Sequence, residues 1–211
     1  MPRKIKRWLY RHYQNNFFVY FIISLLFILG VLAGAITIKI IGPEKNNDVM
    51  LFLNSLFKAI DNNSLNSISI FKQSLIDNYK AILILWISGI LYLGIIVSPA
   101  IMLFRGFALG FSVGFFVYEY GLKGFLFSIL GIFPQNLIII PGIISIASVS
   151  MAFSLSSMKK KKIRLKNNTR LSQIVDYSLI ILAFSSVIFI GSIIEAYIAP
   201  IFLRFLTEYL S

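Results

Sequence analysis

Long apolar runs alternate with short polar segments along the chain. Continuous apolar runs cover residues 17–41, 81–104, 106–116, 125–158 and 174–198. The longer runs reach the length of about 20 residues that crosses a bilayer as a helix. A transmembrane β-barrel would instead show alternating segments of about ten residues. The pattern therefore predicts an all-α fold, a polytopic transmembrane helical bundle with about five spans.

Composition and charge placement support this prediction and orient the chain. Apolar residues make up 58% of the 211 residues and charged residues only 13%. The net charge of +12 arises entirely from two acid-free blocks, at 1–16 and 158–173. Since basic flanks of apolar helices stay in the cytoplasm, we expect a cytoplasmic N-terminus and an outward C-terminus. These two flanks account for the whole basic excess, so no basic folded surface remains for nucleic acid, and we expect no nucleic-acid partner.

The whole chain, residues 1–211, is interpreted as a single integral membrane domain in which three polar segments separate the apolar runs. Residues 1–16 form a basic cytoplasmic arm, 42–80 an extracytoplasmic segment, and 159–173 a basic cytoplasmic loop that touches anionic lipid. Within 42–80, apolar residues recur at helical spacing, which predicts helices on the outer membrane face or over the bundle. A binding surface for an extracytoplasmic partner is the alternative. The first apolar run is interpreted as a span rather than a cleaved signal peptide, because it is too long for a signal core.

The run at 125–158 contains the unusual stretch GIFPQNLIIIPG, residues 131–142. Its 34 residues would make a helix of about 51 Å, against a bilayer core of about 30 Å. Pro134 and Pro141 each remove a backbone donor, and the freed carbonyls need polar partners. Gln135 and Asn136 can supply them. We therefore predict one crossing with a bend at 134–136, and a substrate or ion site is the alternative interpretation.

Glycines at four-residue spacing predict close helix packing. Gly106, Gly110 and Gly114 share one face of a helix, and Gly30 and Gly34 repeat the spacing in the first run. Internal packing between these two helices is favoured over homodimerisation. Further along, Gly121 and Gly124 flank a predicted tight turn.

Chemistry-bearing motifs are absent from the sequence. The chain has no cysteine, its single histidine lies in the basic arm, and no metal-ligand, phosphate-loop or paired-carboxylate motif occurs. We therefore expect no catalytic residue, no cofactor and no metal site. Arg105 follows the second run and is expected in the cytoplasm. Glu195 is the clearest charged residue inside a predicted span, close to its outer end, and Pro200 is expected to end that span.

Three stretches resemble the stage II sporulation protein M family: FRGFALGFSVGFF (104–116), GLKGFLFSILGIFPQNLIIIPG (121–142) and IIEAYIAP (193–200). The signature with Pro134, Gln135, Asn136 and Pro141 is the most specific. Broader relatives carry Pro-His-Gly at this point, so the chain is similar to the narrower sporulation branch. The positions that carry the likeness, interpreted as structural, are Pro134, Gln135, Asn136, Pro141, Gly106, Gly110, Gly114, Gly124, Glu195 and Pro200.

The resemblance implies a non-catalytic scaffold in the mother-cell membrane at the sporulation septum. Family members anchor and localise two peptidoglycan-degrading partners, stage II sporulation proteins D and P, during engulfment. The other partner is the lipid bilayer itself. A permease subunit or small-solute transporter, with an ATPase docked at 159–173, is the alternative from a different class.

Overall fold

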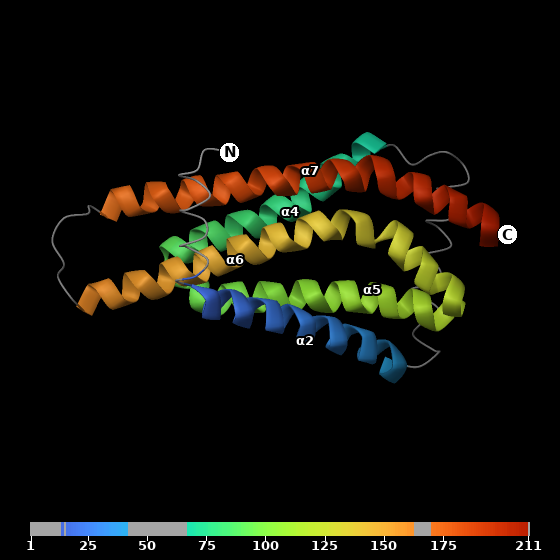
Figure 1. The fold of residues 1–211 in the computed structure, drawn as a ribbon, viewed down its shortest axis with the longest axis horizontal. Helices are drawn as coiled ribbons and strands as arrows, with labels where there is room; N and C mark the ends of the chain where they lie inside the picture. The colour runs from blue at the N-terminus through green and yellow to red at the C-terminus, as the bar shows by residue number, and fades with distance from the viewer. Residues whose placement is uncertain (1–13, 15, 42–66, 163–169, 211) are drawn as a thin grey trace.

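The computed structural model of the protein describes residues 14, 16–41, 67–162 and 170–210. These residues form five long helices: α2 (Phe17–Ile41), α4 (Ser67–Ile90), α5 (Gly94–Gly131), α6 (Phe133–Lys162) and α7 (Arg170–Leu210). Successive helices run in alternate directions, side by side in one bundle (Figure 1). We call the end where α2 begins and α6 ends the basic end, because α6 ends in Lys159–Lys162. The fold is the predicted all-α helical bundle.

Four of the described helices are long and apolar enough to cross a membrane. They are Phe17–Ile40, Gly94–Leu126, Phe133–Met158 and Leu171–Tyr197. The fifth, α4, has a similar length but carries Lys72, Asp77 and Lys80. It nevertheless packs against α5, α6 and α7 along the bundle. The protein is therefore a multi-pass membrane protein.

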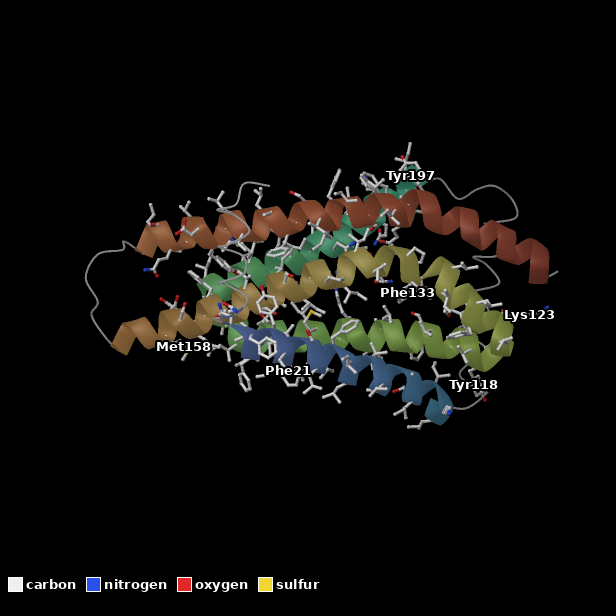
Figure 2. All side chains as sticks on the ribbon, in the orientation of Figure 1. Phe21, Tyr118, Lys123, Phe133, Met158 and Tyr197 are labelled. Carbon is white, nitrogen blue, oxygen red and sulfur yellow. The ribbon has the colours of Figure 1, made fainter. Side chains whose placement is uncertain are left out.

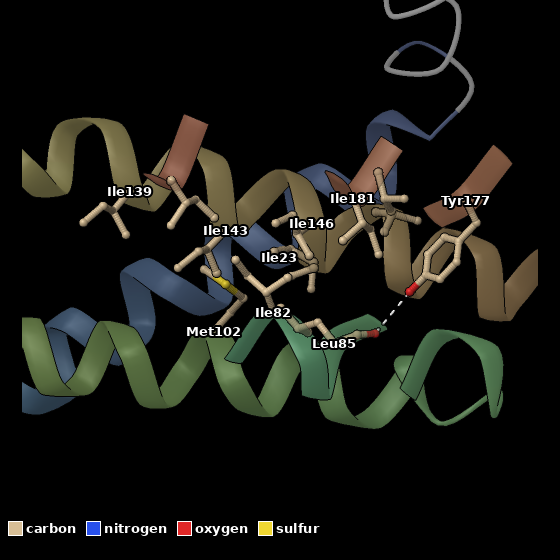
Figure 3. Close-up of a cluster of buried hydrophobic side chains, with 13 residues drawn as sticks. Ile23, Ile82, Leu85, Met102, Ile139, Ile143, Ile146, Tyr177 and Ile181 are labelled. Atoms are coloured by element: carbon tan, nitrogen blue, oxygen red, sulfur yellow. Dashed lines mark hydrogen bonds between the residues drawn. The ribbon is translucent and has the colours of Figure 1, made fainter. Parts of the chain in front are cut away.

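The core is built around α6 and draws on all five helices. Of the most apolar part of α6, 56% is buried inside the bundle, compared with 22% for α2, so α6 is the central helix. Figure 3 shows its Ile139, Ile143 and Ile146 against apolar side chains of the other helices. On the outer surface, Phe21 and Tyr197 point away from the bundle and are half exposed (Figure 2). Exposed apolar faces are expected where a helix contacts lipid.

The second predicted span, 81–104, is wrong. The chain turns at Leu91–Leu93, with Tyr92 in the left-handed region (φ 64°), so α4 ends before the turn and α5 begins after it. Residues 67–80, predicted as part of an extracytoplasmic segment, are instead the first half of α4, and Ser74 and Asn78 are buried. The rest of that segment, 42–66, lies outside the described residues. The turn lies at the basic end (Figure 1).

The bent crossing is present, with its bend slightly earlier than predicted. α5 has non-helical backbone at Gly121 (φ 58°, ψ −130°), where the chain reverses. The short helical piece 122–131 then leads into α6 through Ile132 (Figure 1). Pro134 lies in the first turn of α6, where its missing donor costs nothing, and this explains why the bend precedes the proline. The predicted site of the bend, 134–136, is helical.

Two further prolines do not end their helices. Pro141 lies inside α6, and the helix continues through it to Lys162. The last helix, α7, continues past Pro200 to Leu210, although the apolar span within it ends at Tyr197, close to the predicted end. Neighbouring helices allow proline inside a membrane helix by satisfying the freed backbone groups. The basic arm 1–13 and residues 163–169 of the basic loop lie outside the described residues.

Candidate functional site

An open cavity of about 720 Å³ lies between the helices, toward the end opposite the basic end. Residues of α4, α5, α6 and α7 line it, together with Phe27 of α2. Its polar wall carries the residues Gln73, Ser74, Asp77, Asn78, Arg105, Ser112, Gln135, Asn136 and Glu195. Ionisable groups inside a membrane bundle are costly, and they commonly mark functional sites. This cavity is therefore the candidate site.

Five polar side chains from three helices form a hydrogen-bonded network along this wall. The guanidinium of Arg105 donates to Oδ1 of Asn78 at 2.9 Å. The Asn78 amide donates to Ser74 and to Ser192, at 3.3 Å each. Ser74 donates to Oε2 of Glu195 at 2.5 Å. The network joins α4, α5 and α7, and it satisfies polar atoms that would be expensive to bury alone.

The position of Arg105 corrects the prediction that it lies in the cytoplasm. It lies about 16 Å along α5 from Gly94, roughly half of a bilayer core. Its side chain is half-buried and lines the cavity with Asp77 and Glu195. Arg105 therefore joins Glu195 as a charged residue inside the bundle. The misplaced second span had put Arg105 just outside the membrane.

Gln135 and Asn136 hold the bend that precedes α6. The Gln135 amide donates to the carbonyl of Gly131 at 2.7 Å, and the Asn136 amide donates to that of Ile132 at 2.8 Å. These carbonyls lie at the break between α5 and α6, where a regular ladder is interrupted. Side-chain amides therefore bond backbone carbonyls beside the bend as expected, but the prediction that these are the carbonyls freed by the prolines is wrong. Both residues also line the cavity, so the bend and the site share side chains.

The glycine faces of α2 and α5 pack directly against each other. A Cβ atom added to Gly106 or Gly110 would overlap the carbonyl oxygen of Phe27 or Val31. Conversely, a Cβ atom on Gly30 would lie 2.9 Å from the backbone nitrogen of Phe107. The internal packing predicted for these glycines is confirmed. The face that a homodimer would need is occupied by the chain's own helix.

Two other predicted positions, Gly124 and Pro200, lie within helical segments. Gly124 packs against the carbonyl of Phe116, which allows the chain to reverse tightly after Gly121. Pro200 lies within α7. Of the predicted positions whose side chains the structure describes, Gln135, Asn136 and Glu195 line the candidate site.

A second polar cluster closes the basic end of α4. Each carbonyl in the last turns of a helix has two lone pairs, so it can accept a side-chain hydrogen bond in addition to a backbone one. The hydroxyl of Tyr177 donates to the carbonyls of Leu85 (3.2 Å) and Trp86 (3.1 Å), and Figure 3 shows the first contact. Ser150 donates to Leu85 (2.7 Å) and Ser154 to Gly89 (3.2 Å). The cluster stabilises the turn that the sequence did not reveal.

The residues that sequence reasoning missed are Ser74, Asp77, Asn78, Arg105 and Ser192. Three of them recur at helical spacing on α4, and Ser192 precedes Glu195 by one turn. Arg105 is a single charge in a long apolar stretch, which is itself a signal of an inward-facing site. The spacing on α4 and the isolated charge at Arg105 indicate a shared site only when the ends of the helices are known.

The site offers hydrogen bonds and charges of both signs. Among the described residues, no group of three or more His, Cys, Asp or Glu residues could hold a metal ion. Arg105 is suited to a phosphate or carboxylate, and Asp77 and Glu195 are suited to a cation. The arrangement can therefore bind a polar group that carries both signs of charge.

Comparison with known proteins identifies one family. A model of the family described as stage II sporulation protein M matches residues 23–200. The match includes the glycine face, the bend and all the residues of the polar network. Searches of curated proteins and of solved structures found no match.

Proposed function

The chain belongs to the stage II sporulation protein M family, and from this premise we propose that it is a membrane scaffold for engulfment during endospore formation. Membership of this family makes the chain a sporulation-related membrane protein. In the proposed role it acts without catalysis, at the mother-cell side of the sporulation septum. Its N-terminus lies in the cytoplasm. It anchors and localises stage II sporulation proteins D and P, whose peptidoglycan-degrading domains lie outside the membrane.

The observation that carries the proposal is the family match over most of the chain. The packing supports it, since a scaffold must hold its partner-binding surfaces in fixed relative positions. The glycine faces lock α2 onto α5, and the network from Arg105 to Glu195 ties α4, α5 and α7 together. Interlocked helices of this kind form a rigid frame.

Partner capture tests the proposal directly. The chain is purified from membranes of sporulating cells in mild detergent, and the attached proteins are identified. We expect both peptidoglycan-degrading partners to be captured, and deletion of the chain to delocalise them from the septum. The purified chain alone should release no muropeptides from cell wall.

Two matched variants locate the contact. Replacing Lys159–Lys162 by glutamine alters the cytoplasmic side, and replacing residues 42–66 by a Gly/Ser linker alters the outer side. We expect the first variant to retain both partners and the second to lose them. Loss of partners from the lysine variant, with unchanged topology, would contradict an extracytoplasmic contact.

A permease subunit or small-solute transporter is the second candidate, and the polar cavity favours it. Discontinuous helices with charged residues near mid-membrane are typical of transporter sites. The same purification separates the two functions, because a permease subunit should bring down a cytoplasmic ATPase. Loss of that ATPase in the lysine variant, with no peptidoglycan-degrading partner in either preparation, would replace the scaffold by the permease.

A further inference from the structure

The polar cavity adjoins an apolar groove. The groove lies between α2, α5 and α6 and measures about 370 Å³. It shares four lining residues with the cavity: Phe27, Leu109, Asn136 and Ile140. Its wall is almost free of polar atoms. The two hollows together form one site with a charged part and an apolar part.

We propose that this joint site binds one phospholipid with a phosphoethanolamine headgroup. The headgroup occupies the cavity beside Arg105, and one acyl chain lies in the groove along α2 and α6. The proposal is independent of the scaffold function, since a permease could hold the same lipid.

The phosphate is assigned to Arg105 from its unfilled hydrogen-bonding capacity. A guanidinium has five N–H donors. Among the residues that the structure describes, that of Arg105 donates to Asn78 alone and has no carboxylate within ion-pair distance. Its remaining donors are therefore available at the cavity wall. Arginine binds phosphate oxygens in a two-pronged geometry, which satisfies several of these donors at once.

The ammonium group is assigned to the acceptors around the same cavity. Asp77 and Glu195 bring two carboxylates, each held by a neutral donor, Gln73 or Ser74. Gln135 is only 7% exposed, and its Oε1 atom is buried without a donor in the part of the chain that the structure describes. A primary ammonium has three N–H donors and a positive charge. It matches this surplus of acceptors, and its positive charge offsets one of the two carboxylates.

The apolar groove distinguishes a lipid from a water-soluble zwitterion. Ile28, Leu32 and Leu137 line the groove and are each more than half exposed on the lipid-facing surface of the bundle. The groove therefore opens to the bilayer, the phase that contains acyl chains. A small polar solute would leave this apolar volume unfilled, whereas a phospholipid fills both parts. The cavity volume also falls within the usual range of about 300–1,000 Å³ for ligand sites.

Native mass spectrometry of the purified full chain tests the proposal. The detergent-solubilised protein is titrated with phosphatidylethanolamine, phosphatidylcholine or phosphatidylglycerol of identical acyl chains. We expect phosphatidylethanolamine to be retained about tenfold more strongly than the other two, because each loses at least one charge-assisted hydrogen bond. The choline headgroup has no N–H donor, and the glycerol headgroup has no positive charge.

Paired variants locate the headgroup and the chain. Arg105→Gln should weaken phosphatidylethanolamine binding by about tenfold or more, whereas Lys39→Gln, which removes an equal charge from exposed α2 surface, should not. Ile28→Trp fills the groove and should also weaken binding. Ile36→Trp is its control, because Ile36 is equally exposed on α2 (55% against 53%) but does not line the groove.

Several results would overturn the assignment. Equal retention of the three lipids would remove the headgroup specificity, and unchanged binding in Ile28→Trp would remove the acyl chain from the groove. Chain-free glycerophosphoethanolamine binding as tightly as the lipid would make this a solute site. If Arg105→Gln lowers the melting temperature, Ile28→Trp still decides the question, because it leaves the polar network intact.

Discussion

Replacing Gly110 by alanine probes the close contact between α2 and α5. A Cβ atom at this position would lie 2.7 Å from both the carbonyl carbon and the Cα atom of Val31. These are backbone atoms of α2, so a change of rotamer cannot relieve the overlap. The two helices must move apart along their common face, and neighbouring contacts are lost with them.

The size of the effect follows from the cost of overpacking. Inserting a methyl group where the backbone must shift costs about 1–3 kcal/mol, and we expect the upper part of this range here. For a chain of this size, such a loss lowers the melting temperature by roughly 5–10 °C. Gly114→Ala is the graded control, because its nearest contact is the Cα atom of Ala35 at 3.0 Å. Its loss of stability should be clearly smaller.

Thermal unfolding of the detergent-solubilised variants measures both effects, and light scattering measures their molecular mass. We expect Gly110→Ala to melt below Gly114→Ala and the wild type, with no change in oligomeric mass. Equal melting temperatures for all three would refute the close packing of α2 on α5. A fall in mass at unchanged stability would show instead that the glycine face joins two copies of the chain.

Three further predictions concern the bend, the turn and the cluster that closes it. Asn136→Leu leaves the Ile132 carbonyl without its side-chain donor, so the free energy of unfolding should fall by about 0.6–2 kcal/mol and the melting temperature should fall with it. An unchanged melting temperature would show that the amide does not hold the bend. Because native cysteine is absent, single cysteines can report topology. Leu91→Cys should react with an impermeant thiol reagent only after protoplasts are permeabilised, whereas Leu122→Cys should react in intact protoplasts. A Leu91→Cys protein that is unreactive under both conditions would restore the original second span. Tyr177→Phe should lower stability by about 0.6–1.5 kcal/mol in the same melting assay, and an unaltered midpoint would mean that its two carbonyl contacts contribute nothing.

The second span shows where prediction from the pattern reached its limit. Residues 81–104 are apolar throughout, so hydropathy alone indicates one continuous helix. The chain nevertheless reverses at Leu91–Leu93. Hydropathy reports which residues tolerate lipid, but it does not report the direction of the chain. Side chains from other helices meet the chain just before this reversal, among them Tyr177, about ninety residues later in the chain.

Arg105 shows the same limit for the candidate site. As a charge beside an apolar run, it fitted the rule for a cytoplasmic flank. Its inward position depends on Asn78, which supplies an acceptor from another helix. The burial of a charge is acceptable only where such a partner exists, and the partner is known only from the fold.

By itself, the sequence determined the features that depend on local physics. Continuous apolar length predicted membrane helices, glycines at four-residue spacing predicted the contact between α2 and α5, and amides beside prolines predicted the bend near Pro134. Only the tertiary structure decided which polar groups meet. It placed Arg105 and Glu195 on one cavity, because their hydrogen bonds join helices distant in the chain and polar groups inside a bilayer must find one another.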